Sequence, residues 1–144
     1  NCYSNIFYGS ATSTTATTHT APTLPDARSS EMFSGCGGLT TAPELPATTL
    51  ADYCYQSMFN GCSKLTSVPA LPATTLTNYC YRGIFENCAS LNSITVYANN
   101  ISATDCTYSW LLNVASSGTF RNLGSATYPT GASGIPTGWT EVKN

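Results

Sequence analysis

A unit of sequence repeats along the middle of this chain and constrains its fold more than any other feature. The segment from Met32 reads MFSGCGGLTTAPELPATTLADYCYQS, the segment from Met58 reads MFNGCSKLTSVPALPATTLTNYCYRG, and a third copy opens at Ile84 as IFENCASLNSITV, so successive copies begin 26 positions apart. A unit of this size cannot bury its own apolar face, so the copies must stack on one another. Three apolar positions recur at this spacing: Phe33, Phe59 and Phe85; Cys36, Cys62 and Cys88; Leu39, Leu65 and Leu91.

Two periodicities alternate within each unit and predict one helix and one strand. Between residues 47 and 62 the large apolar residues are three or four positions apart, which favours one face of a helix. In the segments 65–71 and 91–97 β-branched residues alternate with others, which favours short strands. Pro43 and Pro69 fall inside two of the expected strands and cannot donate to a sheet, so we expect these strands to be interrupted.

The repeat resembles the bacterial surface class of the leucine-rich repeat family, whose unit reads roughly A-F-x-x-C-x-x-L-x-x-I-x-L-P-x-x-L. The resemblance covers roughly residues 28–114, and its matching residues in the second copy are Met58, Phe59, Cys62, Leu65, Val68, Leu71, Pro72 and Leu76. It implies an α/β fold, a right-handed leucine-rich-repeat solenoid of about five 26-residue coils. Short parallel strands would line one side of the solenoid, and helices the other.

The two ends of the chain depart from the repeat. The chain begins in the middle of a unit, which indicates the C-terminal part of a longer array. The segment 118–144 carries turn dipeptides and two short β-like pieces, which are typical of a cap that covers the last coil. We therefore predict a solenoid over residues 1–117 and a C-terminal β-like cap over residues 118–144, with Phe120 and Trp139 as its lids.

Composition excludes two classes of partner. Charged residues make up 8% of the chain and the formal net charge is −2. The five cations are scattered, whereas phosphate binding needs them clustered, so we expect no nucleic acid partner. No apolar run approaches the ~20 residues of a membrane span, so we expect no membrane insertion by this segment.

The seven cysteines predict neither zinc binding nor a disulfide within one unit. No C-x-x-C pair occurs, which argues against zinc. Two cysteines eight positions apart on a helix would be ~12 Å apart, which is too far for a disulfide. We expect free thiols that act as small apolar core residues, and disulfides between adjacent coils are the alternative.

Residue types needed for catalysis are sparse. His19 is the only histidine, and it lies in the Thr-rich run 11–20, which we interpret as a solvated or edge-strand segment, with a binding loop as the alternative. The seven acids do not recur at one position of the repeat. We therefore expect no enzyme activity, no metal and no cofactor.

The best candidates for binding are the polar residues between the core positions of each predicted strand. Leu65, Val68 and Leu71 should face the core, which leaves Thr66, Ser67 and Pro69 toward the open face. The equivalent sets are Thr40, Thr41 and Pro43 in the copy before, and Asn92, Ser93 and Thr95 in the copy after. This uncharged, hydroxyl-rich strip suits a glycan or a peptide backbone better than phosphate. The predicted binding residues are Thr41, Glu44, Ser67, Ser93, Thr95 and Tyr97, with Glu44 and Tyr97 at the margin.

The resemblance implies a function at a bacterial surface. Proteins of this class are generally exposed on the cell surface and engage proteins or glycans. We therefore predict a non-enzymatic binding or adhesion module that is extracellular or attached to the cell surface. Two alternatives remain: a receptor-binding or tail-associated protein of a bacteriophage, located on the virion, and a spacer that carries an N-terminal domain.

Overall fold

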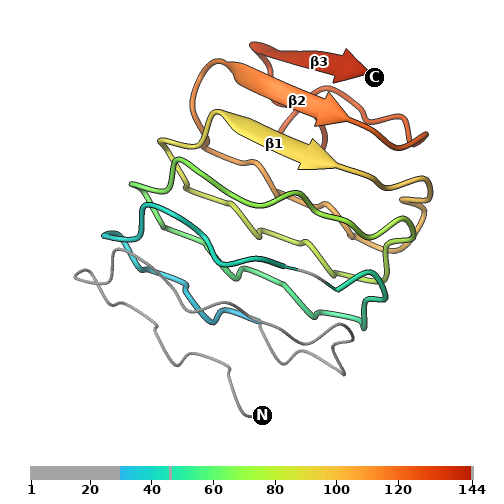
Figure 1. Ribbon diagram of the computed structural model, residues 1–144, viewed down its shortest axis with the longest axis horizontal. Coiled ribbons are helices and arrows are strands. Elements are labelled where there is room, and N and C mark those ends of the chain that lie inside the picture. The colour runs from blue at the N-terminus through green and yellow to red at the C-terminus, as the bar shows by residue number, and fades with distance from the viewer. Residues whose placement is uncertain (1–29, 46, 144) are drawn as a thin grey trace.

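The chain winds into successive coils that stack along one direction (Figure 1). A computed structural model describes residues 30–45 and 47–143. Many hydrogen bonds and ring contacts join residues 26 positions apart in the sequence, so equivalent positions of successive copies lie side by side. The predicted stacking of the copies is confirmed over the described part of the chain.

The predicted fold class is wrong. The described residues contain no helix, and their only strands are β1 (Ser93–Val96), β2 (Gly118–Asn122) and β3 (Trp139–Lys143). These three strands are parallel and form one open sheet in the order β1-β2-β3. The described residues therefore do not form an α/β leucine-rich-repeat solenoid with helices on one side and strands on the other.

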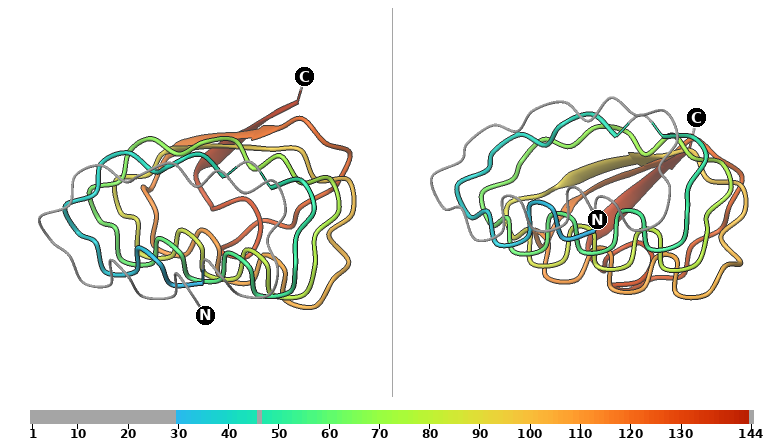
Figure 2. Two further views of the ribbon diagram at one scale, coloured as in Figure 1. Left: turned by 60° about the horizontal axis from the view of Figure 1, so that its bottom comes forward. Right: turned by 90° about the horizontal axis from the view of Figure 1, so that it is seen from below.

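Consecutive reverse turns occupy the place of the predicted helices. In residues 51–62 every second N–H group donates to the carbonyl three residues before it: Cys54 to Ala51, Gln56 to Tyr53, Met58 to Tyr55, Asn60 to Ser57 and Cys62 to Phe59. The N–H groups between them donate to the next coil: Tyr53 to Asn78, Tyr55 to Cys80, Ser57 to Arg82, Phe59 to Ile84 and Gly61 to Glu86. We call residues 51–62, 77–88 and 103–114 the turn ribbons, which Figure 2 shows as a row of short loops.

The backbone of these ribbons repeats every four residues, which a helix does not. Tyr53, Ser57 and Gly61 have φ angles of 62°, 52° and 82°, in the left-handed region. An α-helix also directs each N–H to its own carbonyl four residues back, which leaves no donor for a neighbouring coil. The turn ribbons keep half of their donors free for that purpose, so they contribute to stacking as well as to the shape of the coil.

The sheet begins only in the third copy, which lacks the proline of the two earlier copies. Pro43 and Pro69 lack an N–H, and the segments around them make only isolated bridges, Thr41 to Ser67 and Leu71 to Val96. In the third copy Thr95 stands in the proline position, and β1 forms there. The predicted interruption of the strands by proline is therefore confirmed.

The core between the sheet side and the turn ribbons consists of columns of equivalent residues. Phe33, Phe59 and Phe85 are at most 1% exposed, and their rings stack with centroids 5.5 Å and 5.7 Å apart. Cys36, Cys62 and Cys88 are fully buried beside them, as predicted. At the C-terminal end, Phe120 and Trp139 are buried as well.

Candidate binding face

Exposed hydroxyl side chains lie on the open face of the sheet and of the coils that precede it. Thr41 pairs with Ser67, Ser93 pairs with Thr119, and Thr119 pairs with Thr140. Ser67 and Ser93 occupy the same position of successive copies. All five side chains are exposed. We call Thr41, Ser67, Ser93, Thr119 and Thr140 the hydroxyl row.

The alternation of side chains in β1 explains why this row faces outward. Ile94 and Val96 are 1% and 2% exposed, so they point into the core, and Ser93 and Thr95 point the other way. Thr95 is half-buried, whereas Ser93 is exposed. In the second copy Leu65 and Leu71 are buried as predicted, but Val68 is only half-buried.

The proline positions do not fit the predicted face. Pro43 is buried and Pro69 is half-buried, although both were expected on the open side. A change of register between the second and third copies accounts for Pro69: Gly61 N donates to Glu86 O, which aligns positions 26 apart, whereas Leu71 bridges Val96, 25 positions away. The second copy thus carries one more residue than the third between Gly61 and Leu71, the segment that contains Pro69.

Sequence reasoning missed the part of the face that the C-terminal strands contribute. Thr119 and Thr140 extend the hydroxyl row, and the exposed Arg121 and Val142 are in register with Thr95. The signal was present, because Thr119 follows Ser93 by one repeat and Arg121 follows Thr95 by the same interval. Assigning the segment to a separate cap concealed the continuity of the face.

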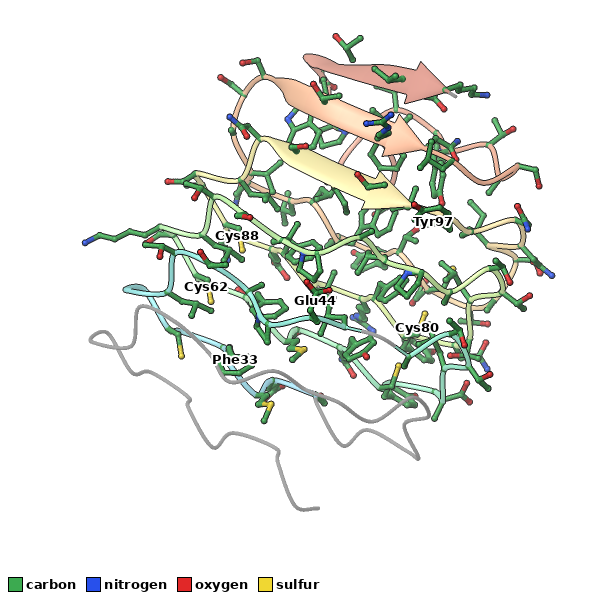
Figure 3. All side chains as sticks on the ribbon, in the orientation of Figure 1. Phe33, Glu44, Cys62, Cys80, Cys88 and Tyr97 are labelled. Atoms are coloured by element: carbon green, nitrogen blue, oxygen red, sulfur yellow. The ribbon has the colours of Figure 1, made fainter. Side chains whose placement is uncertain are left out.

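The structure does not bring the two predicted margin residues together. Glu44 and Tyr97 are both exposed. Figure 3 shows them on different coils and well apart. They therefore do not form one edge of a shared site.

Threonines also line a hollow at the bend that leads from the sheet side to the turn ribbons. It has a volume of about 280 Å³ and is lined by Thr48, Thr49, Leu50, Thr74, Thr75 and Thr77. The repeated text Leu-Pro-Ala-Thr-Thr-Leu places Thr48 and Thr49 in one coil and Thr74 and Thr75 in the next, and Thr77 follows the second of these segments. The hollow thus offers hydroxyl groups and no charge.

No group of metal-ligating side chains is found in residues 30–45 and 47–143. No three His, Cys, Asp or Glu side chains gather there as metal ligands. The same ranges contain no helix of the length and apolarity that a bilayer crossing requires. His19 and Cys2 lie outside the described residues, as does the Thr-rich run 11–20.

The six described cysteines are buried thiols. Cys62 Sγ donates to the carbonyl of Phe33 over 3.2 Å, and Cys88 Sγ donates to that of Phe59 over 3.1 Å. Burial raises the pKa of Cys62 to about 12 and that of Cys80 to about 12. Since the thiolate is the nucleophile, these side chains are unreactive in the folded protein.

We therefore expect the thiols to react only after unfolding. An aromatic disulfide reagent should modify none of the six described cysteines in the native protein, and the count after denaturation should approach seven, the number in the sequence. Reductant should leave the melting temperature unchanged. A rise in stability of several degrees under oxidising conditions, or a denatured count of five or fewer, would contradict the free thiols and indicate disulfides between coils.

Comparison with known proteins adds no further assignment: no protein-family model, curated protein or solved structure matches this chain. The leucine-rich repeat resemblance therefore rests on the repeat residues alone. It stays a prediction.

Proposed function

We propose that this chain is a non-enzymatic binding module that engages a protein or glycan ligand through the face bearing the hydroxyl row. The observation that carries the proposal is that exposed hydroxyl side chains are in register in two groups, Thr41 with Ser67 across two coils and Ser93 with Thr119 and Thr140 across the sheet. Each hydroxyl offers one donor and two acceptor positions. A ligand that is itself rich in hydroxyl or amide groups could pair with several of them along the row.

The charge of the face supports the same class of ligand. Arg121 is the one charged residue among the described positions in register with the hydroxyl row and with Thr95. One cation is too little for a polyanion such as nucleic acid, whose binding depends on several phosphate contacts. Neutral glycans and peptide backbones carry no charge, so their binding does not require a cluster of cations.

The location that we propose is the bacterial cell surface or the extracellular medium. This part of the proposal is supported by the repeat text, which resembles the bacterial surface class of leucine-rich repeats. A spacer is the second candidate function. It is favoured by the uniform buried columns, such as the stacked Phe33, Phe59 and Phe85, which hold the coils together without any ligand.

The test is a binding array of glycans and extracellular-matrix proteins, followed by titration of any ligand that binds. The double variant Ser67→Lys with Ser93→Lys should abolish that binding, because two lysines would disrupt the middle of the hydroxyl row. Each substitution is at an exposed site, so the free energy of unfolding should change by less than ~0.5 kcal/mol per site. The variant Thr119→Lys should also weaken binding, since Thr119 continues the row on β2.

The matched control carries the same added charge elsewhere. Ala89 and Thr127 are exposed and lie outside the row. The double variant Ala89→Lys with Thr127→Lys should keep the affinity of the parent protein. An unchanged affinity after substitution of Ser67 and Ser93 would remove the hydroxyl row as the binding face, and an array without any bound ligand would leave the spacer as the better proposal.

A further inference from the structure

A second exposed surface lies on the turn ribbons, away from the hydroxyl row. The rings of Tyr53 and Tyr79 stack with centroids 4.6 Å apart and planes 6° from parallel. The guanidinium carbon of Arg82 lies 5.7 Å from the centroid of the Tyr79 ring and 5.1 Å from that of Tyr108. Arg82 Nη1 is also 4.0 Å from Asp105 Oδ2. We call Tyr53, Tyr79, Arg82, Asp105 and Tyr108 the tyrosine column.

Burial does not explain the presence of these rings. Tyr53 is 42% exposed and Tyr108 is 50% exposed, whereas the core tyrosines Tyr55 and Tyr81 are almost fully buried. Tyr79 is half-buried, and together with the exposed Tyr53 and Tyr108 it forms an apolar surface with hydroxyl edges on successive coils. Tyrosine is a rigid group that offers a large contact area to a ligand at little cost in side-chain entropy.

The backbone also argues against a purely structural role. Tyr53 and Tyr79 have φ angles of 62° and 58°, where a side chain larger than that of glycine or asparagine is unfavourable. The two other left-handed columns of the same ribbons carry small or amide residues, for example Gly61, Asn87 and Asn113. Tyrosine thus stands in two successive coils at a position that the backbone would fill more readily with glycine.

A hollow adjoins the end of the column. It has a volume of about 160 Å³, and Asp105, Thr107, Tyr108 and Ser133 are among the residues that line it. It is smaller than the ~300–1,000 Å³ of sites for drug-sized molecules, so it has room for one small ring rather than for an extended ligand. A carboxylate, hydroxyl groups and an aromatic side chain therefore line one small, open hollow.

We propose that the tyrosine column is a binding site for a neutral saccharide. The ring of Tyr108 would pack against the apolar C–H face of one sugar, and the Asp105 carboxylate would accept hydrogen bonds from its hydroxyl groups. Arg82 is held between two rings and would donate to further sugar oxygens. Since Arg82 and Asp105 offset each other's charge, the site favours a neutral sugar over an acidic one. This site does not depend on the hydroxyl row.

The experiment uses a printed array of neutral and acidic oligosaccharides, and then titration of the whole chain with a saccharide that binds. The variant Tyr108→Ala should bind at least about tenfold more weakly, the loss expected when an aromatic anchor is truncated. The double variant Tyr53→Gly with Tyr79→Gly should also lose affinity, while its melting temperature stays the same or rises, because glycine relieves the left-handed backbone. A structural role of the two rings would instead lower that temperature.

The control makes the same kind of backbone change in another column of the ribbons. Asn87 and Asn113 have φ angles of 63° and 59°, and the double variant Asn87→Gly with Asn113→Gly should keep the parent affinity. The proposal is overturned if no neutral saccharide binds, if Tyr108→Ala binds within about threefold of the parent protein, or if the asparagine control loses as much affinity as the tyrosine variants. If the double variant Ser67→Lys with Ser93→Lys no longer binds a saccharide that Tyr108→Ala still binds, that saccharide binds at the hydroxyl row. This result would also overturn the proposal for the tyrosine column.

Discussion

Replacing Phe59 with alanine should lower the free energy of unfolding by about 3–5 kcal/mol, the usual cost of removing an aromatic side chain from a packed core. Phe59 is fully buried and stacks on Phe33 on one side and on Phe85 on the other. The substitution would therefore leave a cavity in the middle of the column. Hydrogen bonds to the neighbouring coils hold the backbone in place, so the surrounding residues cannot move in to fill it. Phe59 N donates to Ile84 O over 2.9 Å, and Cys62 N donates to Phe59 O over 3.1 Å, so the backbone at this position is fixed as well.

The measurement is equilibrium denaturation of the parent protein and of two alanine variants. Tyr97→Ala is the control, since it removes an aromatic side chain that is 38% exposed, and it should cost no more than about 0.5 kcal/mol. A loss of less than about 1 kcal/mol for Phe59→Ala, well below the range for buried aromatic residues, would show that the phenylalanine column does not hold the coils together.

The columns could be predicted from the sequence because stacking depends on spacing alone. Once Phe33, Phe59 and Phe85 recur at one fixed interval, any repeating coil of that length places them side by side, whatever local structure the coil has. The same reasoning holds for the thiols at Cys36, Cys62 and Cys88. It also applies to Ser93 and Thr119, which are 26 positions apart and are paired in the sheet. This pairing was not predicted, because residues 118–144 were assigned to a separate cap.

The local structure within a coil could not be predicted, because two conformations share nearly the same apolar period. The pairs Cys54–Tyr55 and Met58–Phe59 are four residues apart and fit one face of a helix of 3.6 residues per turn. They fit equally well a ribbon in which two residues point inward and the next two outward. The ribbon differs from a helix in that alternate N–H groups donate to the next coil. These hydrogen bonds join two copies, so the order of apolar residues within one copy does not reveal them.

The candidate sites show the same limit. The outward direction of Ser67 and Ser93 was predicted from their places between the apolar core positions of each copy, and both side chains are exposed. The tyrosine column was not predicted, although Tyr53 and Tyr79 are one repeat apart. The segment was interpreted as a helix, and only the apolar residues on its buried face were considered. Arg82 and Tyr108 share one position of the repeat, but the residue type changes there from copy to copy, so repetition gave no signal of their contact.

Replacing Gly124 with alanine should destabilise the protein by about 2–4 kcal/mol, because the added methyl group would meet backbone that cannot give way. A Cβ at this position would overlap the carbonyl oxygen of Ala98 and would lie 2.6 Å from that of Tyr97. The residues on either side are tied to the previous coil: Leu123 N donates to Val96 O over 2.9 Å, and Ser125 N donates to Asn99 Oδ1 over 2.8 Å. Relief of the overlap would therefore break hydrogen bonds that join two coils.

Gly37→Ala is the matched control for this substitution. A Cβ on Gly37 would meet only Ser63 Oγ, at 3.8 Å, which is ordinary contact. The two variants should thus differ in their free energies of unfolding by at least about 2 kcal/mol, measured by denaturation under the same conditions. Equal stabilities would mean that the backbone after β2 does not approach Tyr97 and Ala98 so closely, and the register of β2 against β1 would then have to be revised, since Gly124 lies just beyond the end of β2.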